Sequence, residues 1–447
     1  MSDKRRRRRA KRLPEETVQV DIESLSAEGR GIAHVDDRTV FVDQALAGET
    51  VLFKYTKLSK NIAEARAVEI LKASPDRIEP KCKAFELCGG CSLQHMGPET
   101  QLELKQKTFL EHLEHIGKVS AENLLPPLTG ALWGYRHKAR LSVRYVRKKD
   151  RIMVGFRERG SSFVTDTEQC EILHASVGYL ITELSECIGS MEIKERIPQI
   201  EVAVGDNQTV LVFRHLDPMP AADRKILLEL AKQHELVVYL QAGSPDELEA
   251  LYPAQPEVLY YKLPKHNVRV EFQPSDFTQV NPEINRNMLD CAINFLELNE
   301  NDQVLDLFCG LGNFSLPMAR HCAHVTAVEG AEVMVKKGRE NAARNNIENI
   351  EFHMADLYSD EIATAPWMKK KYNKILLDPP RSGADAVIRY LAKMDAERIV
   401  YVSCHPATLA RDAGVLVNEL GYRLSDAGIM DMFPHTRHVE SIAVFVK

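Results

Sequence analysis

The sequence predicts an α/β fold with a C-terminal Rossmann-like domain, an N-terminal OB-like β-barrel and a central α+β domain. In residues 271–447, short apolar strand patterns alternate with helical patterns, as expected of a doubly wound parallel sheet. Residues 15–74 contain closely spaced β-rich runs separated by turn signals, which is typical of a small barrel. Residues 75–270 mix both patterns. A chain of 447 residues accommodates these domains, since a domain takes roughly 150 residues.

The composition is that of an ordinary globular protein. Hydrophobic residues make up 44% and charged residues 27% of the chain, and no apolar run is long enough to span a membrane. No apolar segment of a secretion signal follows the first positive charges. The nine cysteines are an odd number, which argues against a disulfide framework and for a reducing compartment. We therefore expect a cytoplasmic protein that needs no membrane.

Residues 1–14 form a basic arm. Its first 12 residues contain eight Lys or Arg side chains and one acid, whereas the whole chain has a net charge of −6. Such a run is expected to be disordered and to bind phosphates by counterion release. A solubilising or targeting tail is the alternative, and no specific role follows from the arm itself.

The barrel is the first folded domain. Its turn-separated strand runs are Val18–Ile22, Thr39–Val42, Glu49–Phe53 and Ala65–Ile70. The run Leu25–Ala33, together with Phe41-Val42 and Gly48-Glu49, resembles the TRAM domain, an OB-like barrel of RNA-modifying enzymes. That resemblance implies oligonucleotide binding on a strand face, with a purely structural barrel as the alternative.

A cysteine cluster and a basic surface are predicted for the central domain. The candidate metal ligands are Cys82, Cys88, Cys91 and Cys170. Four thiolates suit a tetrahedral zinc ion or an iron–sulfur cube, and their spacing does not decide between the two. Beyond a helical stretch at residues 99–117, cations between Arg136 and Arg159 interleave with aromatic residues. A charge run is usually a solvated face, but in an otherwise acidic chain we favour an RNA-binding surface.

The C-terminal domain places candidate ligand-binding residues at the ends of its strands. The expected strands are Gln303–Leu307, His324–Val328, Ile350–His353, Lys374–Leu377 and Arg398–Val402. Gly310 and Gly312, after the first strand, let the backbone turn tightly against a nucleotide-like ligand. Glu329 ends the second strand and suits ribose hydroxyls, and Asp356 follows the third, where adenine is read. The loop lacks the third glycine of a dinucleotide fingerprint, so we expect S-adenosylmethionine, with Asp306 facing its amino group.

The fourth strand ends in Asp378-Pro-Pro-Arg381, at the edge where substrates bind in open α/β sheets. In methyltransferases that act on amino groups, an aromatic residue follows the prolines of a related motif. Arg381 at that place fits a target without an amino group. RNA cytosine-5 methyltransferases often carry a cysteine directly after the proline, and this chain has none.

Cys404 follows the fifth strand and is the candidate nucleophile. A thiolate that adds to C6 of a pyrimidine raises the electron density at C5, which otherwise cannot accept a methyl group. A packing role is the alternative, because free cysteines are often buried. The C5 proton must then leave, and Glu440 is a candidate carboxylate base, with a surface glutamate as the alternative. His405 or His438 could deprotonate or orient Cys404, and neither assignment is forced.

Five motifs together resemble the RNA uridine-5-methyltransferase family over essentially the whole chain after the arm. They are Phe277–Asn281, Asp306–Phe314, Asp378–Gly383, Val402–Pro406 and His438–Glu440. The resemblance implies a class I methyltransferase domain with Cys404 as nucleophile and Glu440 as base. The cofactor contacts that it implies are Gln279, Phe308, Asn313, Glu329, Asp356 and Asp378.

The domains attached to the catalytic domain separate the members of that family. The tRNA enzyme lacks both the barrel and the cysteine cluster, and one rRNA enzyme has the cluster without the barrel. The presence of both here implies a uridine of 23S rRNA, a structural [4Fe–4S] cluster rather than zinc, and a monomer that requires no protein partner. The alternatives are another rRNA or tRNA uridine, or a non-catalytic assembly factor that binds rRNA. A radical S-adenosylmethionine enzyme is disfavoured, because its Cys-x3-Cys-x2-Cys spacing is absent.

Overall fold

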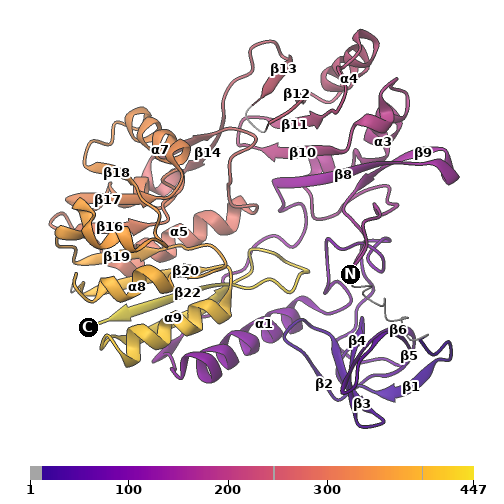
Figure 1. Cartoon of the computed structure of the whole chain (residues 1–447), viewed down its shortest axis with the longest axis horizontal. Coiled ribbons are helices and arrows are strands. Elements are labelled where there is room, and N and C mark those ends of the chain that lie inside the picture. Colours follow the sequence, from indigo (N-terminus) through magenta and orange to yellow (C-terminus); the bar gives the residue numbers. More distant parts are fainter. Residues whose placement is uncertain (1–12, 245–246, 395) are drawn as a thin grey trace, which may run out of the picture. The chain divides into compact units, whose positions relative to one another are not determined.

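The computed structural model describes residues 13–244, 247–394 and 396–447 (Figure 1). Most of the basic arm lies outside this set, so its role stays a prediction. The chain separates into two compact units. The first unit comprises the chain up to Lys81 with Cys91–Leu104 and His435–Arg437, and the second comprises Cys82–Gly90, Lys105–Pro434 and His438–Lys447. Within the described residues, no helix has both the length and the apolar character needed to cross a membrane.

The first unit contains the predicted barrel. Its six-stranded sheet has the order β1-β5-β6-β4-β3-β2, in which only β4 and β6 pair in parallel. The strands are β1 (Val18–Asp21), β2 (Ser24–Leu25), β3 (Gly31–Val35), β4 (Arg38–Asp43), β5 (Thr50–Leu58) and β6 (Ile62–Lys72). Val40, Val42 and Phe53 are fully buried, because alternate residues of a strand point to the same face. Buried Glu49 accepts two hydrogen bonds from the Arg77 guanidinium, at 2.5 and 2.7 Å, which ties the chain after the barrel to its core.

A long helix connects the barrel sequence to the rest of the chain. Helix α1 (Pro98–His112) continues into a π-helical turn at Leu113–Gly117 and ends at Lys118, whose backbone is left-handed. A short strand, β7 (Asn123–Leu124), follows. The predicted helical stretch at residues 99–117 is therefore confirmed.

The central region is a six-stranded sheet with helices on one face. The strand order is β13-β12-β11-β10-β8-β9. Its strands are β8 (Lys138–Val146), β9 (Arg151–Gly155), β10 (Gln199–Val204), β11 (Thr209–Arg214), β12 (Val237–Gln241) and β13 (Leu248–Tyr252), and its helices are α2 (Ala175–Gly178), α3 (Ile181–Gly189) and α4 (Ala221–Gln233). In β8, Leu141 and Val143 pack into the core with these helices, whereas Arg140 and Arg144 are exposed. The outward face of β8 is thus polar and carries cations.

The C-terminal region is an eight-stranded sheet with the order β18-β17-β16-β19-β20-β22-β21-β7. Its other strands are β16 (Gln303–Leu307), β17 (His324–Glu329), β18 (Ile350–Met354), β19 (Lys374–Leu377), β20 (Arg398–Ser403), β21 (Arg423–Met430) and β22 (Glu440–Val446). The first five strands of the order are parallel, and β22 runs antiparallel to β20 and to β21. The five expected strands are confirmed, and β21 and β22 add an antiparallel ending to the sheet. A separate hairpin, β14 (Leu259–Leu263) and β15 (Val268–Phe272), precedes this sheet.

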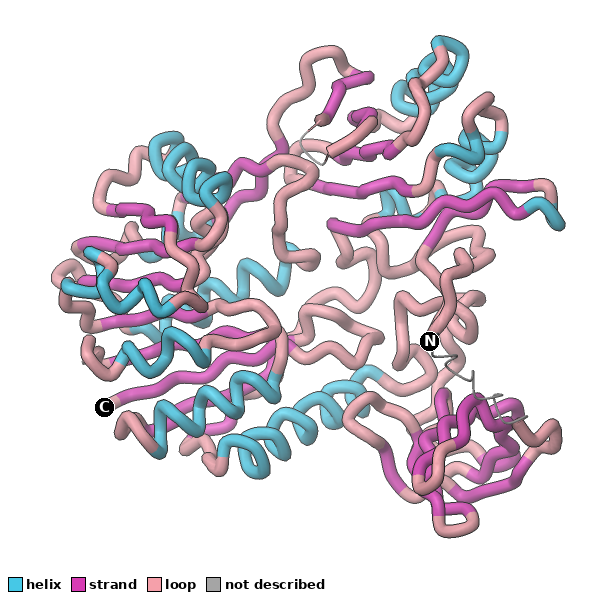
Figure 2. Tube along the Cα trace, viewed as in Figure 1, coloured by secondary structure: helices cyan, strands magenta, loops and turns pink. Residues whose placement is uncertain are grey.

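Helices cover both faces of the eight-stranded sheet (Figure 2). The helices of this region are α5 (Pro282–Leu296), α6 (Ser315–Met318), α7 (Glu332–Arg344), α8 (Asp385–Leu391) and α9 (Pro406–Asn418). Val304 and Val400 pack with α5 and α7 on one face of the sheet. Their chain neighbours Leu305 and Ile399 point to the other face and pack with α8 and α9. Two buried clusters therefore hold the parallel strands in the doubly wound arrangement that the sequence predicted.

Candidate active site

The carboxyl ends of the parallel strands form the edge at which the candidate residues gather. The pairings Leu307 with Val328, Leu307 with Leu377, and Leu377 with Tyr401 put the ends of β16, β17, β19 and β20 in register. Ligands of open α/β sheets bind in the crevice outside such ends. The residues that follow these strands, including Glu329, Asp378 and Cys404, are therefore neighbours in the fold.

The loop after β16 adopts a conformation that glycine permits. Phe308, Gly310 and Gly312 have φ angles of 69°, 54° and 90°. A Cβ on Gly312 would lie 2.9 Å from Cγ of Leu316, so a side chain at this position is disfavoured both by backbone strain and by this close contact. The backbone N–H of Gly310 donates to Oε2 of Glu329 at 3.1 Å. The loop and the acid at the end of β17 therefore hold each other.

Three carboxyl groups approach one another at this edge. Asp306 is fully buried, receives a hydrogen bond from the Ser315 hydroxyl, and has an Oδ1 atom with no partner among the described residues. Burial raises the pKa of Asp306 to about 8, and the Asp378 and Glu329 carboxylates add to the rise while Ser315 opposes it. Burial also raises the pKa of Asp378 to about 7. Such a group of acids favours a ligand that brings positive charge.

The other predicted cofactor residues are placed differently. Oδ1 of Asn313 accepts from the Tyr261 hydroxyl at 2.7 Å and from Asn285 at 3.2 Å, and Nδ2 of Asn313 donates to Asn285 at 2.9 Å. The amide of Asn313 thus keeps one N–H for a ligand. Asp356 is exposed after β18, with its carboxylate accepting from the N–H of Tyr358 at 2.9 Å. The Phe308 and Tyr358 rings lie 5.9 Å apart.

Gln279 lies half-buried in the loop between β15 and α5. The ammonium group of Lys138 donates to the carbonyls of Pro274, at 2.7 Å, and of Asp276. Lys337, on α7, pairs with the Asp276 carboxylate. Two lysines from separate elements therefore fix the loop that carries Gln279.

Cys404 and Glu440 are opposite each other at the end of two antiparallel strands. Ser403, the last residue of β20, pairs with Ser441 of β22, and one more step of the same register sets Cys404 against Glu440. Burial raises the pKa of Cys404 to about 11, with Glu440 and Asp378 adding to the rise. Burial raises the pKa of Glu440 to about 8, and Asp378 adds to it. Both groups therefore hold their protons more strongly than they would in water.

Arg381 is the cation that faces this pair. Its guanidinium lowers the pKa of both Cys404 and Glu440, against the larger effect of burial. It also lies 3.4 Å from Nδ1 of His438, whose ring is 5.5 Å from the ring of Phe433. The sequence motif predicted a role of Arg381 in target selection, and its effect on these two pKa values was not predicted. The signal was available, because a cation follows the acid of a strand-end motif.

His405 has a structural role that the sequence analysis did not consider. It is the N-cap residue of α9, and its Nδ1 accepts from the backbone N–H of Thr408 at 3.4 Å. The ring therefore satisfies the first turn of the helix. The Thr408 hydroxyl also lies 3.4 Å from the same nitrogen. Nδ1 of His405 is thus engaged with Thr408, and Nε2 is the ring nitrogen left for other contacts.

Three of the four predicted cysteine ligands lie in the second unit, and each raises the pKa of at least one of the others or has its own pKa raised by them. Burial raises the pKa of Cys170 to about 12, with Cys88 and Cys82 adding to the rise. The N–H of Gly90 donates to the Cys88 sulfur at 3.4 Å. Cys91 belongs to the first unit. Across the described part of the chain, no three His, Cys, Asp or Glu side chains are arranged to hold a metal ion, so the predicted [4Fe–4S] site is not supported by the geometry.

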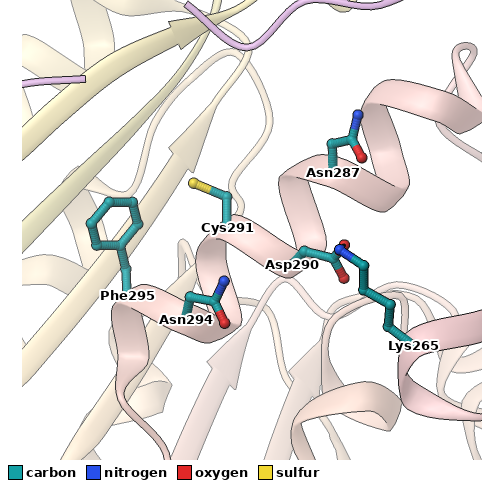
Figure 3. Close-up of a pocket in the computed structure, with 6 residues that line it drawn as sticks. All are labelled: Lys265, Asn287, Asp290, Cys291, Asn294 and Phe295. Carbon is teal, nitrogen blue, oxygen red and sulfur yellow. The ribbon is translucent and has the colours of Figure 1, made fainter. Parts of the chain in front are cut away.

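A separate pocket lies against α5 (Figure 3). Its volume is about 390 Å³. It is lined by Lys265, Asn287, Asp290, Cys291, Asn294 and Phe295. The Lys265 ammonium group reaches Asp290 at 2.5 Å, so the charges of this pocket are paired. None of the predicted site residues lines it.

Comparisons with known proteins agree with this architecture. A model of the tRNA (uracil-5-)-methyltransferase family matches residues 134–447, and a TRAM domain model matches residues 11–68. A protein of Alkalilimnicola ehrlichii named 23S rRNA (uracil(1939)-C(5))-methyltransferase RlmD is 52% identical over 98% of both chains. A protein of Nitrosococcus oceani with the same name is 50% identical over 97% of both. The chain is also similar to the crystal structure of Pyrococcus abyssi tRNA (uracil-54, C5)-methyltransferase in complex with S-adenosyl-L-homocysteine. The match covers 96% of this chain and 100% of that one, with a TM-score of 0.72 and 23% identity.

Proposed function

The chain belongs to the tRNA (uracil-5-)-methyltransferase family, and from that premise we propose that it methylates C5 of uracil 1939 in 23S rRNA. It is an S-adenosylmethionine-dependent RNA uracil-C5-methyltransferase. The target position is supported by relatives that share about half of its residues over nearly its whole length, the barrel included. The observation that carries the chemistry is the register that sets Cys404 against Glu440 at the mouth of the sheet.

We propose that Cys404 starts the reaction: its thiol loses a proton to solvent, and the thiolate adds to C6 of the uracil. The new bond between sulfur and C6 shifts the C5–C6 π electrons to C5 and O4 as an enolate. S-adenosylmethionine supplies the methyl group when bound, and C5 takes it up as the donor's carbon–sulfur bond breaks. Arg381 would stabilise the thiolate before the attack, because its charge opposes the effect of burial on Cys404.

Glu440 would complete the reaction as the base. It removes the proton from C5, the C5–C6 double bond re-forms, and the bond between sulfur and C6 breaks. The raised pKa of Glu440, about 8, suits this task because its carboxylate then holds a proton strongly. Burial of Glu440, which is 4% exposed, also keeps water away from the proton transfer.

The acid-lined loop suits S-adenosylmethionine. The orphaned Oδ1 of buried Asp306 would accept from the charged amino group of the methionine part. We assign Glu329 to the ribose hydroxyls, Asp356 to the adenine edge and Phe308 to contact with the adenine face. Gln279, Asn313 and Asp378 would position the cofactor and the base, with Asn313 using its one remaining N–H.

We also propose that Cys82, Cys88, Cys91 and Cys170 hold a structural [4Fe–4S] cluster. The support is the thiol donor set, the mutual influence of three of these thiols, and the N–H of Gly90 directed at the Cys88 sulfur. Iron and acid-labile sulfide contents of protein purified without oxygen test this proposal. About four of each per chain is expected, and stoichiometric zinc without sulfide would overturn it.

The barrel and the exposed cations of β8 support RNA as the partner. Both surfaces are of kinds that bind RNA. A protein that modifies 23S rRNA would work in the cytoplasm, and a monomer without protein partners remains our expectation.

The target assignment is tested by mapping 5-methyluridine in 23S rRNA. A strain without this protein should lack the modification at position 1939 and regain it with the wild-type gene. Cys404→Ser should fail to restore it, whereas Cys187→Ser, which changes a thiol of α3 in the central region, should restore it fully. Restoration by Cys404→Ser, or a modification unchanged in the deletion strain, would contradict the proposal.

A further inference from the structure

Helix α1 contributes a lysine whose charged end is buried. Lys105 is 2% exposed, and its ammonium group donates to Oδ1 of Asp431 at 2.6 Å and to the carbonyl of Phe433 at 3.1 Å. Asp431 is itself 4% exposed. A buried charge is costly unless it is paired and hydrogen-bonded, so this lysine is held in one position.

Asp431 begins the segment that leads to Glu440. It follows Met430, the last residue of β21, and Met430 pairs directly with Glu440 in the antiparallel register. The position of Asp431 is therefore coupled to the strand end that carries the proposed base. The charged groups that shift the pKa of Glu440 are Asp378 and Arg381, and Lys105 is not among them.

Four successive residues, 431–434, are each held by a distant side chain. Lys105 holds Asp431 and the carbonyl of residue 433, as described. Asn281, the N-cap residue of α5, approaches the carbonyl of Met432 at 3.5 Å. The hydroxyl of buried Tyr135 donates to the carbonyl of Pro434 at 3.0 Å. Such a series fixes the backbone between β21 and β22 without any regular secondary structure.

We propose that Lys105 is a positioning residue for Glu440, which it serves by fixing the segment from Asp431 to Pro434. A buried ion pair contributes little net stability but selects one geometry. A base must lie within hydrogen-bond reach of the proton that it removes, and a displacement of about 1 Å can slow a reaction on the order of 100-fold. The inference rests on the proposed function, since Glu440 must act as the base.

The test separates addition of the thiol from removal of the proton. The double variant Lys105→Met/Asp431→Leu removes both charges, so no unpaired charge stays buried and the fold is retained. With 5-fluorouridine RNA and S-adenosylmethionine, this variant should form the covalent adduct at the wild-type rate. With ordinary RNA, it should accumulate a methylated covalent complex, and turnover should fall on the order of 100-fold.

A matched control lies on the same helix. Lys107 is an exposed surface residue that lies 3.8 Å from Glu111 one turn away, and Lys107→Met should behave as wild type. Wild-type turnover by the double variant would overturn the inference, as would an equal slowing of adduct formation and product release. The absence of any adduct with the wild-type protein would instead overturn the proposed function, and the inference with it.

Discussion

The two segments that border the active site are held in place to different degrees by contacts from elsewhere in the chain. The loop after β16 depends mainly on its own backbone, with left-handed residues at Phe308, Gly310 and Gly312, and its few outside contacts include Glu329. The segment from Asp431 to Pro434 depends on side chains from other parts of the chain, among them Lys105. The loop proposed to bind the cofactor is therefore shaped largely by a local motif, whereas the position of the proposed base is set by tertiary structure. Changes to the two segments should affect different steps of the reaction.

The largest effect is expected from Glu440→Gln. The amide keeps the shape of the side chain but cannot remove the C5 proton, so turnover should fall by roughly 10²- to 10⁴-fold. The methylated RNA should stay bound to Cys404, which denaturing gel electrophoresis detects. The variant should also unfold at a higher temperature near neutral pH. Because the pKa of Glu440 is raised from 4.5 to about 8 in the folded protein, this group lowers the stability of the fold as pH rises above 4.5, and the amide removes that effect. Unchanged turnover would remove Glu440 from the mechanism.

The next effect concerns the glycine loop. Gly312→Ala forces a side chain into a backbone with φ of 90° and towards Leu316. Strain of about 1–3 kcal/mol should weaken binding of S-adenosylhomocysteine by roughly 5- to 150-fold, measured by titration calorimetry. Proton removal from a complex already methylated should be unaffected. Gly189→Ala, at an open position of α3, is the control. Slower proton removal in Gly312→Ala would show that the glycine loop also affects the proposed base, and would contradict separate roles for the two segments.

The rate of proton removal by the proposed base should depend on pH differently from the rate of adduct formation. Glu440 has a pKa raised to about 8, and in the proposed mechanism it acts as a carboxylate, so its active form increases as pH rises. Decay of the methylated covalent complex should therefore quicken by about tenfold per pH unit below 8 and level off above it. Formation of the adduct should continue to quicken beyond that point, because the pKa of Cys404 is raised to about 11. Stopped-flow measurement of the two steps distinguishes them, and a pH-independent decay would contradict the role of Glu440.

Tyr135→Phe should give the smallest effect. It removes one hydrogen bond, to the carbonyl of Pro434, and such a bond contributes about 1 kcal/mol. Proton removal should slow by about fivefold, with the affinity for S-adenosylhomocysteine unchanged. Single-turnover kinetics and calorimetry measure these two quantities. A loss of affinity without a change in proton removal would show that the segment serves the cofactor instead.

The fold and the strand-end residues could be predicted because their signals are local. Apolar strands, the glycines after β16 and the residues that follow β19 and β20 are read directly from short motifs. The role of His405 as a helix cap was also readable, since Pro406 follows it at the start of α9. The sequence analysis did not consider it, because a histidine beside a candidate nucleophile suggested chemistry.

Other features of the site could not be predicted from one sequence. Lys105 and Asp431 are 326 residues apart, and nothing in either local sequence indicates a buried pair. The bonds that occupy the amide of Asn313 likewise come from Tyr261 and Asn285, on other elements. Such contacts depend on packing in three dimensions, where a polar group must find a partner once it is buried.

The central claim is that Cys404 forms a covalent bond to the uracil. The direct test incubates the wild-type protein with S-adenosylmethionine and 23S rRNA that contains 5-fluorouridine, followed by digestion and mass spectrometry. Fluorine cannot leave C5 as a proton does, so the intermediate is trapped. We expect a methylated fluorouridine nucleotide on the peptide that contains Cys404. An adduct on another residue, or methylation of ordinary RNA without any adduct on fluorinated RNA, would contradict it.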